Sequence, residues 1–162
     1  MKKIIIFLTL VFYVVSGYSQ FNIKGHTVLN KFVLGFDNEK SLERKGVDII
    51  EELTVHTFGE NPLIRKVVIN EHFFKNQVSS VVLLLVNDEL YSVRIYPRSN
   101  YSDRRINAHM DLLNNKYKTI FQRQEWENDF VNVKYCPESE EESFLYLDKS
   151  LANKYPKPFQ SF

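Results

Sequence analysis

The sequence contains little cysteine, glycine or proline, and no excess charge of either sign. Its 162 residues include one Cys, five Gly and five Pro, which excludes a disulfide-stapled scaffold, a collagen-like repeat and a low-complexity chain. The 21 Lys and Arg residues nearly balance 20 Asp and Glu residues. Without a cationic surplus, we expect no nucleic-acid partner. With 44% hydrophobic and 14% aromatic residues, the chain is expected to fold into a globular domain.

The amino-terminal segment has the parts of a secretory signal peptide. Two lysines precede an uncharged, largely apolar run from Ile4 to Val15, and small residues follow up to Ser19. The run is too short for a membrane-spanning helix, which needs about 20 residues. We therefore expect residues 1–19 to be a signal peptide and residues 20–162 to be a single globular domain. This domain should be periplasmic or secreted, with no permanent membrane span.

The clearest local pattern is a β-hairpin in the middle of the chain, preceded by a strand over Ile64–Phe74. Val78–Val86 is rich in β-branched residues and leucine, Asn87 and Asp88 favour the positive φ angles of a tight turn, and Leu90–Tyr96 alternates. With a regular turn, side chains alternate without interruption along both strands, and this alternation predicts a core face and an opposite face. The core face is expected to carry Val82, Leu84, Val86, Tyr91, Val93 and Ile95, and the opposite face Val81, Leu83, Leu85, Ser92, Arg94 and Tyr96.

A helix is expected soon after the first strands of the domain. Phe21–Phe36 predicts one strand or two short ones, and Asp37 or Asn38 can cap a helix. Apolar residues from Leu42 to Leu53 follow helical spacing, interrupted at Gly46. The segment is therefore predicted to be either one helix with a weak point or two short pieces.

The second half of the chain predicts a longer helix and another hairpin. An apolar stripe at helical spacing, with Ser102 as N-cap, ends at Tyr117. Val131–Cys136 and Phe144–Leu147 are predicted strands, and Lys149–Lys154 a short helix. The expected fold class is α+β, a mainly antiparallel sheet with helices packed on one face.

Motifs for catalysis or cofactor binding are absent from the sequence. The histidines at 26, 56, 72 and 109 have no metal-ligand spacing, and neither a phosphate loop nor a serine-hydrolase motif is present. We therefore expect no metal and no cofactor. Cys136 and a histidine such as His109 are weak catalytic candidates, because only the fold could assemble a site around either of them. Alternatively, the lone cysteine is inert or forms an intermolecular disulfide.

A basic and aromatic surface is the strongest binding candidate. It comprises residues of the second hairpin strand and of the segment after it: Arg94, Tyr96, Arg98, Tyr101, Arg104 and Arg105. Arg and Tyr are enriched at binding hot spots, and two arginines in the first turn of a helix oppose its dipole. The partner would be an envelope protein or a small ligand. Alternatively, these long side chains only cover the edge of the sheet.

Two segments carry a resemblance to other proteins. Leu83–Ile95 (LLLVNDELYSVRI) and the helix end Leu113–Tyr117 (LNNKY) together resemble the core pattern of small uncharacterised exported bacterial proteins, although Lys118 stands where those have glycine. The resemblance implies an exported α+β domain and transfers no catalytic residues.

We therefore expect an exported, non-enzymatic domain that acts through protein or ligand contacts. The alternatives are an exported hydrolase-type enzyme with a site assembled by the fold, and a structural envelope protein that forms a dimer linked through its cysteine.

Overall fold

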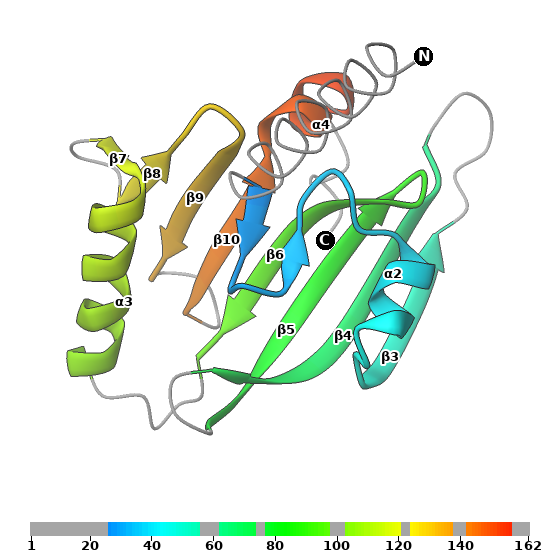
Figure 1. Cartoon of the computed structure of the whole chain (residues 1–162), viewed down its shortest axis with the longest axis horizontal. Helices are drawn as coiled ribbons and strands as arrows, with labels where there is room; N and C mark the ends of the chain where they lie inside the picture. Colours follow the sequence, from blue (N-terminus) through cyan, green and yellow to red (C-terminus); the bar gives the residue numbers. More distant parts are fainter. Residues whose placement is uncertain are drawn as a thin grey trace, which may run out of the picture.

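An eight-stranded antiparallel sheet forms the centre of the structure, a computed structural model that describes residues 26–55, 62–73, 77–97, 103–120, 124–137 and 142–156 (Figure 1). The strand order is β3-β4-β5-β6-β10-β9-β8-β7. The strands are β3 (Ile49–Val55), β4 (Ile64–Phe73), β5 (Gln77–Val86), β6 (Glu89–Tyr96), β7 (Lys118–Ile120), β8 (Glu125–Glu127), β9 (Val131–Cys136) and β10 (Ser143–Asp148). The predicted, mainly antiparallel sheet is confirmed.

A small hairpin and three short helices accompany this sheet in the described ranges. The hairpin consists of β1 (Thr27–Val28) and β2 (Phe32–Val33), and the helices are α2 (Glu39–Arg44), α3 (Asp103–Lys116) and α4 (Lys149–Lys154). In Figure 1, β1, β2 and α2 lie over the sheet, and α3 lies beside β7, β8 and β9. In these ranges, no helix has both the length and the apolar character that a membrane crossing requires.

The tight turn between β5 and β6 is confirmed, but a β-bulge follows it. Asn87 and Asp88 have φ angles of 49° and 63°, as a two-residue hairpin turn requires. The register then shifts, so that Leu84 pairs with Ser92. Tyr91 is the extra residue of the bulge, and one extra residue reverses the alternation of all side chains beyond it.

Because of this bulge, the predicted faces of the hairpin are wrong. Leu83 pairs with Val93, and Val82 pairs with Arg94. Val82 and Leu84 therefore share a face with Arg94, not with Val93. We call the face that carries Leu83 and Val93 the covered face, and the face that carries Val82, Leu84 and Arg94 the open face.

Buried apolar side chains form one cluster on each face of the sheet. On the covered face, strand residues such as Leu83 pack with Phe32 of β2, Leu42 of α2 and Leu113 of α3. On the open face, a smaller cluster contains Ile64, Leu84, Val86, Tyr91 and Leu151, and Leu151 belongs to α4. Helix α4 therefore packs on the other side from α2 and α3, and the expected packing of helices on one face is not confirmed.

Helix α2 ends where the sequence suggested that a helix could continue. Asn38 is its N-cap, in a capping box with Ser41, which confirms one of the two predicted caps. Gly46 has a φ of +62°, the left-handed conformation that terminates helices. Strand β3 follows, so the prediction of helix up to Leu53 is wrong. Because residues 48–53 are all exposed, this strand lacks the alternation that identifies most strands.

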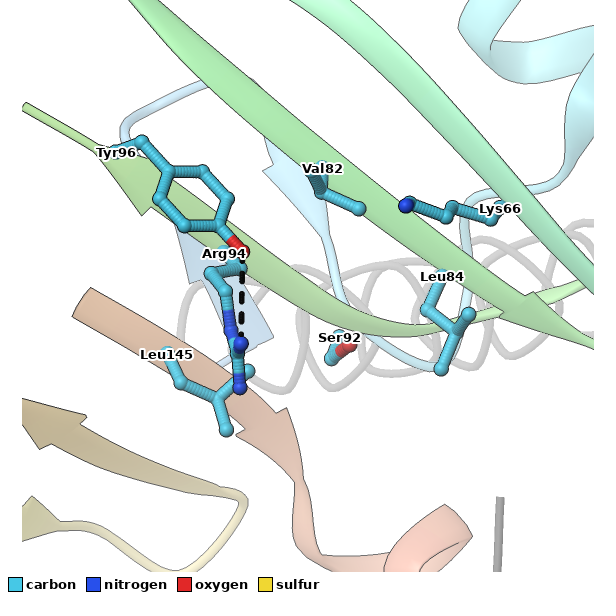
Figure 2. A pocket seen from close by; sticks show the side chains of 7 residues that line it. All are labelled: Lys66, Val82, Leu84, Ser92, Arg94, Tyr96 and Leu145. Atoms are coloured by element: carbon cyan, nitrogen blue, oxygen red, sulfur yellow. Dashed lines mark hydrogen bonds between the residues drawn. The ribbon is translucent and has the colours of Figure 1, made fainter. Parts of the chain in front are cut away.

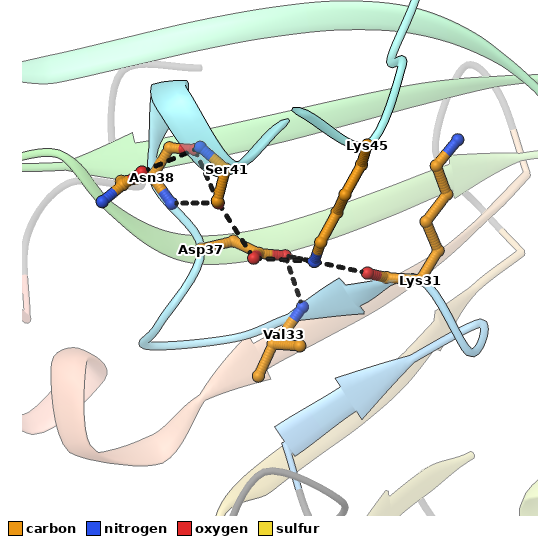
Figure 3. Close-up of polar contacts among 6 residues, drawn as sticks. All are labelled: Lys31, Val33, Asp37, Asn38, Ser41 and Lys45. Atoms are coloured by element: carbon orange, nitrogen blue, oxygen red, sulfur yellow. Dashed lines mark hydrogen bonds and ion pairs between the residues drawn. The ribbon is translucent and has the colours of Figure 1, made fainter. Parts of the chain in front are cut away.

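Asp37, the other predicted cap, instead joins α2 to β2 (Figure 3). It is buried, and its carboxylate accepts hydrogen bonds from the Val33 backbone N–H at 2.7 Å and from the Ser41 hydroxyl at 3.0 Å. The Lys45 ammonium donates to both oxygens of the same carboxylate, at 2.7 Å from Oδ1 and 2.5 Å from Oδ2, and to the Lys31 carbonyl at 2.7 Å. This network fixes α2 against the β1–β2 hairpin on the covered face.

The remaining predicted elements agree with the structure where it describes them. The long helix is α3, the second hairpin is β9 and β10, and the short final helix is α4. The predicted cap Ser102 and the first residues of the Phe21–Phe36 segment lie outside the described residues. Strands β7 and β8 were not predicted, because three residues are too few to show a period.

Candidate functional site

A shallow depression lies on the open face, where β4, β5, β6 and β10 run side by side (Figure 2). Its cavity volume is about 70 Å³. Three apolar side chains and four polar ones line it: Val82, Leu84, Leu145, Lys66, Ser92, Arg94 and Tyr96. The depression thus combines an apolar surface with two cations and two hydroxyl groups.

Strand pairing explains why these residues meet. The lining residues form two rows of cross-strand partners. Leu84 of β5 is at the centre of one row, and Arg94 of β6 is at the centre of the next. The first row is Lys66, Leu84 and Ser92, and the second is Val82, Arg94 and Leu145. The bulge at Tyr91 decides the composition of both rows, because without it Arg94 would face the core.

The two cations of the depression have no acidic partner in the described ranges. The half-buried guanidinium of Arg94 donates from Nη1 to the Tyr96 hydroxyl at 3.4 Å. Figure 2 shows this pair on one side of the depression and Lys66 on the other, with Ser92 between them. Such a guanidinium can still donate two parallel hydrogen bonds to a carboxylate. An anionic group is therefore the complementary ligand.

The structure brings two of the six predicted binding residues into this site. Arg94 and Tyr96 line the depression. Arg98 and Tyr101 lie outside the described residues. Arg104 and Arg105 are on α3, and their side chains are likewise outside what the structure describes. The structure therefore describes side chains only from the strand half of the predicted patch, and binding by this patch stays a prediction.

Sequence reasoning missed the other residues of the depression. Lys66 comes from β4, and only the register between β4 and β5 places it beside Leu84. Ser92 was predicted in the correct strand, but the predicted register gave it the wrong neighbours on β5. Leu145 comes from β10, whose pairing with β6 joins distant parts of the chain. No local sequence signal reports either pairing.

The two weak catalytic candidates lie on opposite faces of the sheet. His109 packs edge-on against Phe144, with ring centroids 4.5 Å apart, on the covered face. Cys136 alternates with the buried Tyr135 on β9, so it faces the open side as predicted. The fold does not bring these two side chains together. An intermolecular disulfide through the half-buried Cys136 stays a prediction.

His109 belongs to a buried, uncharged cluster. Its Nε2 lies 2.8 Å from the Tyr146 hydroxyl, and burial lowers the pKa of His109 to about 4. Burial also raises the pKa of Tyr117 to about 12 and raises that of Tyr146. These groups are neutral at pH 7, and their position in the core indicates packing.

A second buried histidine connects the two ends of the described chain. His26 Nδ1 lies 3.1 Å from Asp148 Oδ2, and the His26 ring contacts Phe36 and Phe130. The other oxygen of Asp148 accepts from the Leu151 backbone N–H at 2.8 Å, as the N-cap of α4. The pair therefore attaches the amino-terminal hairpin to the start of α4.

In the described ranges, no group of three or more His, Cys, Asp or Glu side chains could hold a metal ion. Comparison of the chain with protein-family models, curated proteins and solved structures finds no match. The assignment of the candidate site therefore depends on the geometry of the open face.

Proposed function

We propose that this chain is an exported, non-enzymatic binding domain that takes an anionic group on the open face of its sheet. Export follows from the signal peptide predicted over residues 1–19. The observation that carries the binding proposal is the half-buried Arg94, which has no acidic partner in the described ranges and lies beside an apolar surface. The bound group belongs to a small ligand or to a partner protein.

The shape and chemistry of the depression suggest which part of a ligand it takes. About 70 Å³ accommodates a carboxylate or a similar anion with a short aliphatic stem. Arg94 and Lys66 would attract the anion, and Val82, Leu84 and Leu145 would contact the stem. A hydrogen bond to a charged group contributes about 1.5–3 kcal/mol, so Arg94 should supply a large share of the affinity.

An NMR titration with two small probes of opposite charge tests this proposal. Hexanoate and hexylammonium share an alkyl chain, but only hexanoate complements Arg94. We expect hexanoate to shift the amide signals of Ser92, Arg94 and Leu145 in a saturable manner. The Arg94→Gln variant should bind hexanoate roughly tenfold more weakly, because it loses a charged hydrogen-bond donor.

Lys134→Gln is the matched control for the Arg94 variant. Lys134 is also on the open face but outside the depression, and it already has an acidic partner, Glu125, at 3.9 Å. Its replacement should leave hexanoate affinity unchanged. Equal binding of the two probes, or equal affinity in the Arg94→Gln and Lys134→Gln variants, would contradict the proposal.

A further inference from the structure

Strand β3 is an outer strand of the sheet with both faces exposed. It has seven residues, whereas β7 at the opposite edge has three. Every residue from Asp48 to Leu53 is exposed, including Ile50 at 55% and Leu53 at 47%. Figure 1 shows β3 at the margin of the sheet, beside α2. Apolar side chains are thus left uncovered on a long edge strand.

The outer backbone edge of β3 has no partner in the described ranges. The strand pairs with β4 alone, and from Glu51 to Val55 this pairing is regular. Proteins commonly protect such edges with lysine, proline or a very short strand. The β3 sequence contains no lysine or proline, although a register irregularity lies near its start. The regular part can accept one more strand.

The charged residues of β3 itself and of the position before it are all acidic. Asp48 and Glu51 have no basic partner in the described ranges, while Glu52 lies 3.1 Å from Arg65 of β4. Pairing of β3 with its copy in a second molecule would bring six carboxylates into one short ribbon, and like charges across strands are destabilising. A basic segment would avoid this repulsion.

We infer that β3 is a docking strand for an extended segment of a partner protein that carries lysine or arginine between apolar residues. The segment adds to the sheet through backbone hydrogen bonds. Its cations face Asp48 and Glu51, and its apolar side chains cover Ile50 and Leu53. This surface is at the edge of the sheet and adjoins the depression at Lys66, which pairs with Leu53.

The test uses a probe peptide that is the charge complement of β3 in antiparallel order. The capped, fluorescein-labelled heptapeptide VTLKKII is compared with VTLEEII, and with a form of VTLKKII that is N-methylated at alternate residues. Fluorescence anisotropy should show binding of the first peptide only, because N-methylation removes the backbone donors and leaves the charges unchanged. Hydrogen exchange should show new protection of alternate amides of β3, those that point away from β4.

Variants of the exposed acids complete the test. Glu51→Gln should weaken VTLKKII binding roughly twofold, as expected for one exposed charge pair, because one of the two peptide lysines lies opposite Glu51. Asp111→Asn is the control, because Asp111 is an exposed acid on α3 and should have no effect. Equal binding of VTLEEII or of the N-methylated peptide would overturn the inference. A dimer of the protein that protects the same amides would also overturn it, in favour of a second copy.

Discussion

His109 should make the protein less stable as the pH falls from 7 to 5. Burial lowers the pKa of His109 to about 4 in the folded protein, whereas an unfolded chain has a histidine pKa of about 6.5. Between these values the unfolded state binds a proton that the folded state does not. The stability that neutral, buried His109 contributes is therefore fully present above about pH 6.5, and it is lost as the pH falls towards 4.

The size of this effect follows from the same two pKa values. A difference of about 2.5 pH units corresponds to about 3 kcal/mol. Of this, about 2 kcal/mol should be lost between pH 7 and pH 5. That amount is a large part of the total stability of a typical domain, which is about 5–15 kcal/mol, so the effect should be readily measured.

Urea unfolding followed by fluorescence is a suitable assay, because Trp126 is the single tryptophan and is 3% exposed. The comparison is between the wild type and His109→Gln, which keeps a hydrogen-bonding group near Tyr146 but does not titrate. The variant should lose about 2 kcal/mol less than the wild type between pH 7 and pH 5. The same pH dependence in both proteins would refute the buried, neutral state of His109.

Two further predictions concern stability at neutral pH. Gly35 and Gly46 both have positive φ angles, of 74° and 62°, but only at Gly35 would an added Cβ come within 2.9 Å of the Asp148 carboxylate. Gly46→Ala should cost about 1–2 kcal/mol in urea unfolding and Gly35→Ala clearly more. Equal costs would argue against this contact. Asp148→Ala should cost about 2–4 kcal/mol, since it removes the cap of α4 and the partner of His26. Asp129→Ala, at an exposed position, should cost less than about 0.5 kcal/mol. Similar losses of stability in the Asp148→Ala and Asp129→Ala variants would contradict these two roles of Asp148.

The sequence predicts strands best where one face is buried and the other is not. The β5–β6 turn, β9 and α3 all follow from local patterns that burial imposes. Strand β3 was taken for a helix because exposure of both of its faces removes the alternation. Ile49, Ile50 and Leu53 then match helical spacing by chance. Only Gly46 indicated that the helix could end before these residues, and it was compatible both with one helix that has a weak point and with two short pieces.

The candidate site was only partly predictable, and the bulge at Tyr91 is the main reason. A bulge adds one residue without any change in composition, so the alternation appears unbroken in the sequence. Arg94 and Tyr96 were recognised as a polar pair, but the apolar neighbours assigned to them were on the wrong face. Lys66 and Leu145 required the order of the strands, which depends on contacts between distant parts of the chain.

The strand order also has a consequence for how the chain folds. β3 to β6 and β7 to β10 each pair in sequence order, so each half can form from contacts that are local in the sequence. Only the seam between β6 and β10, where Ile95 meets Phe144, joins the halves within the sheet. Closing it costs more loop entropy and should be the slower step. A ligand held between Arg94 and Leu145 spans this seam, so it would slow the separation of the two halves and lengthen the lifetime of the folded state.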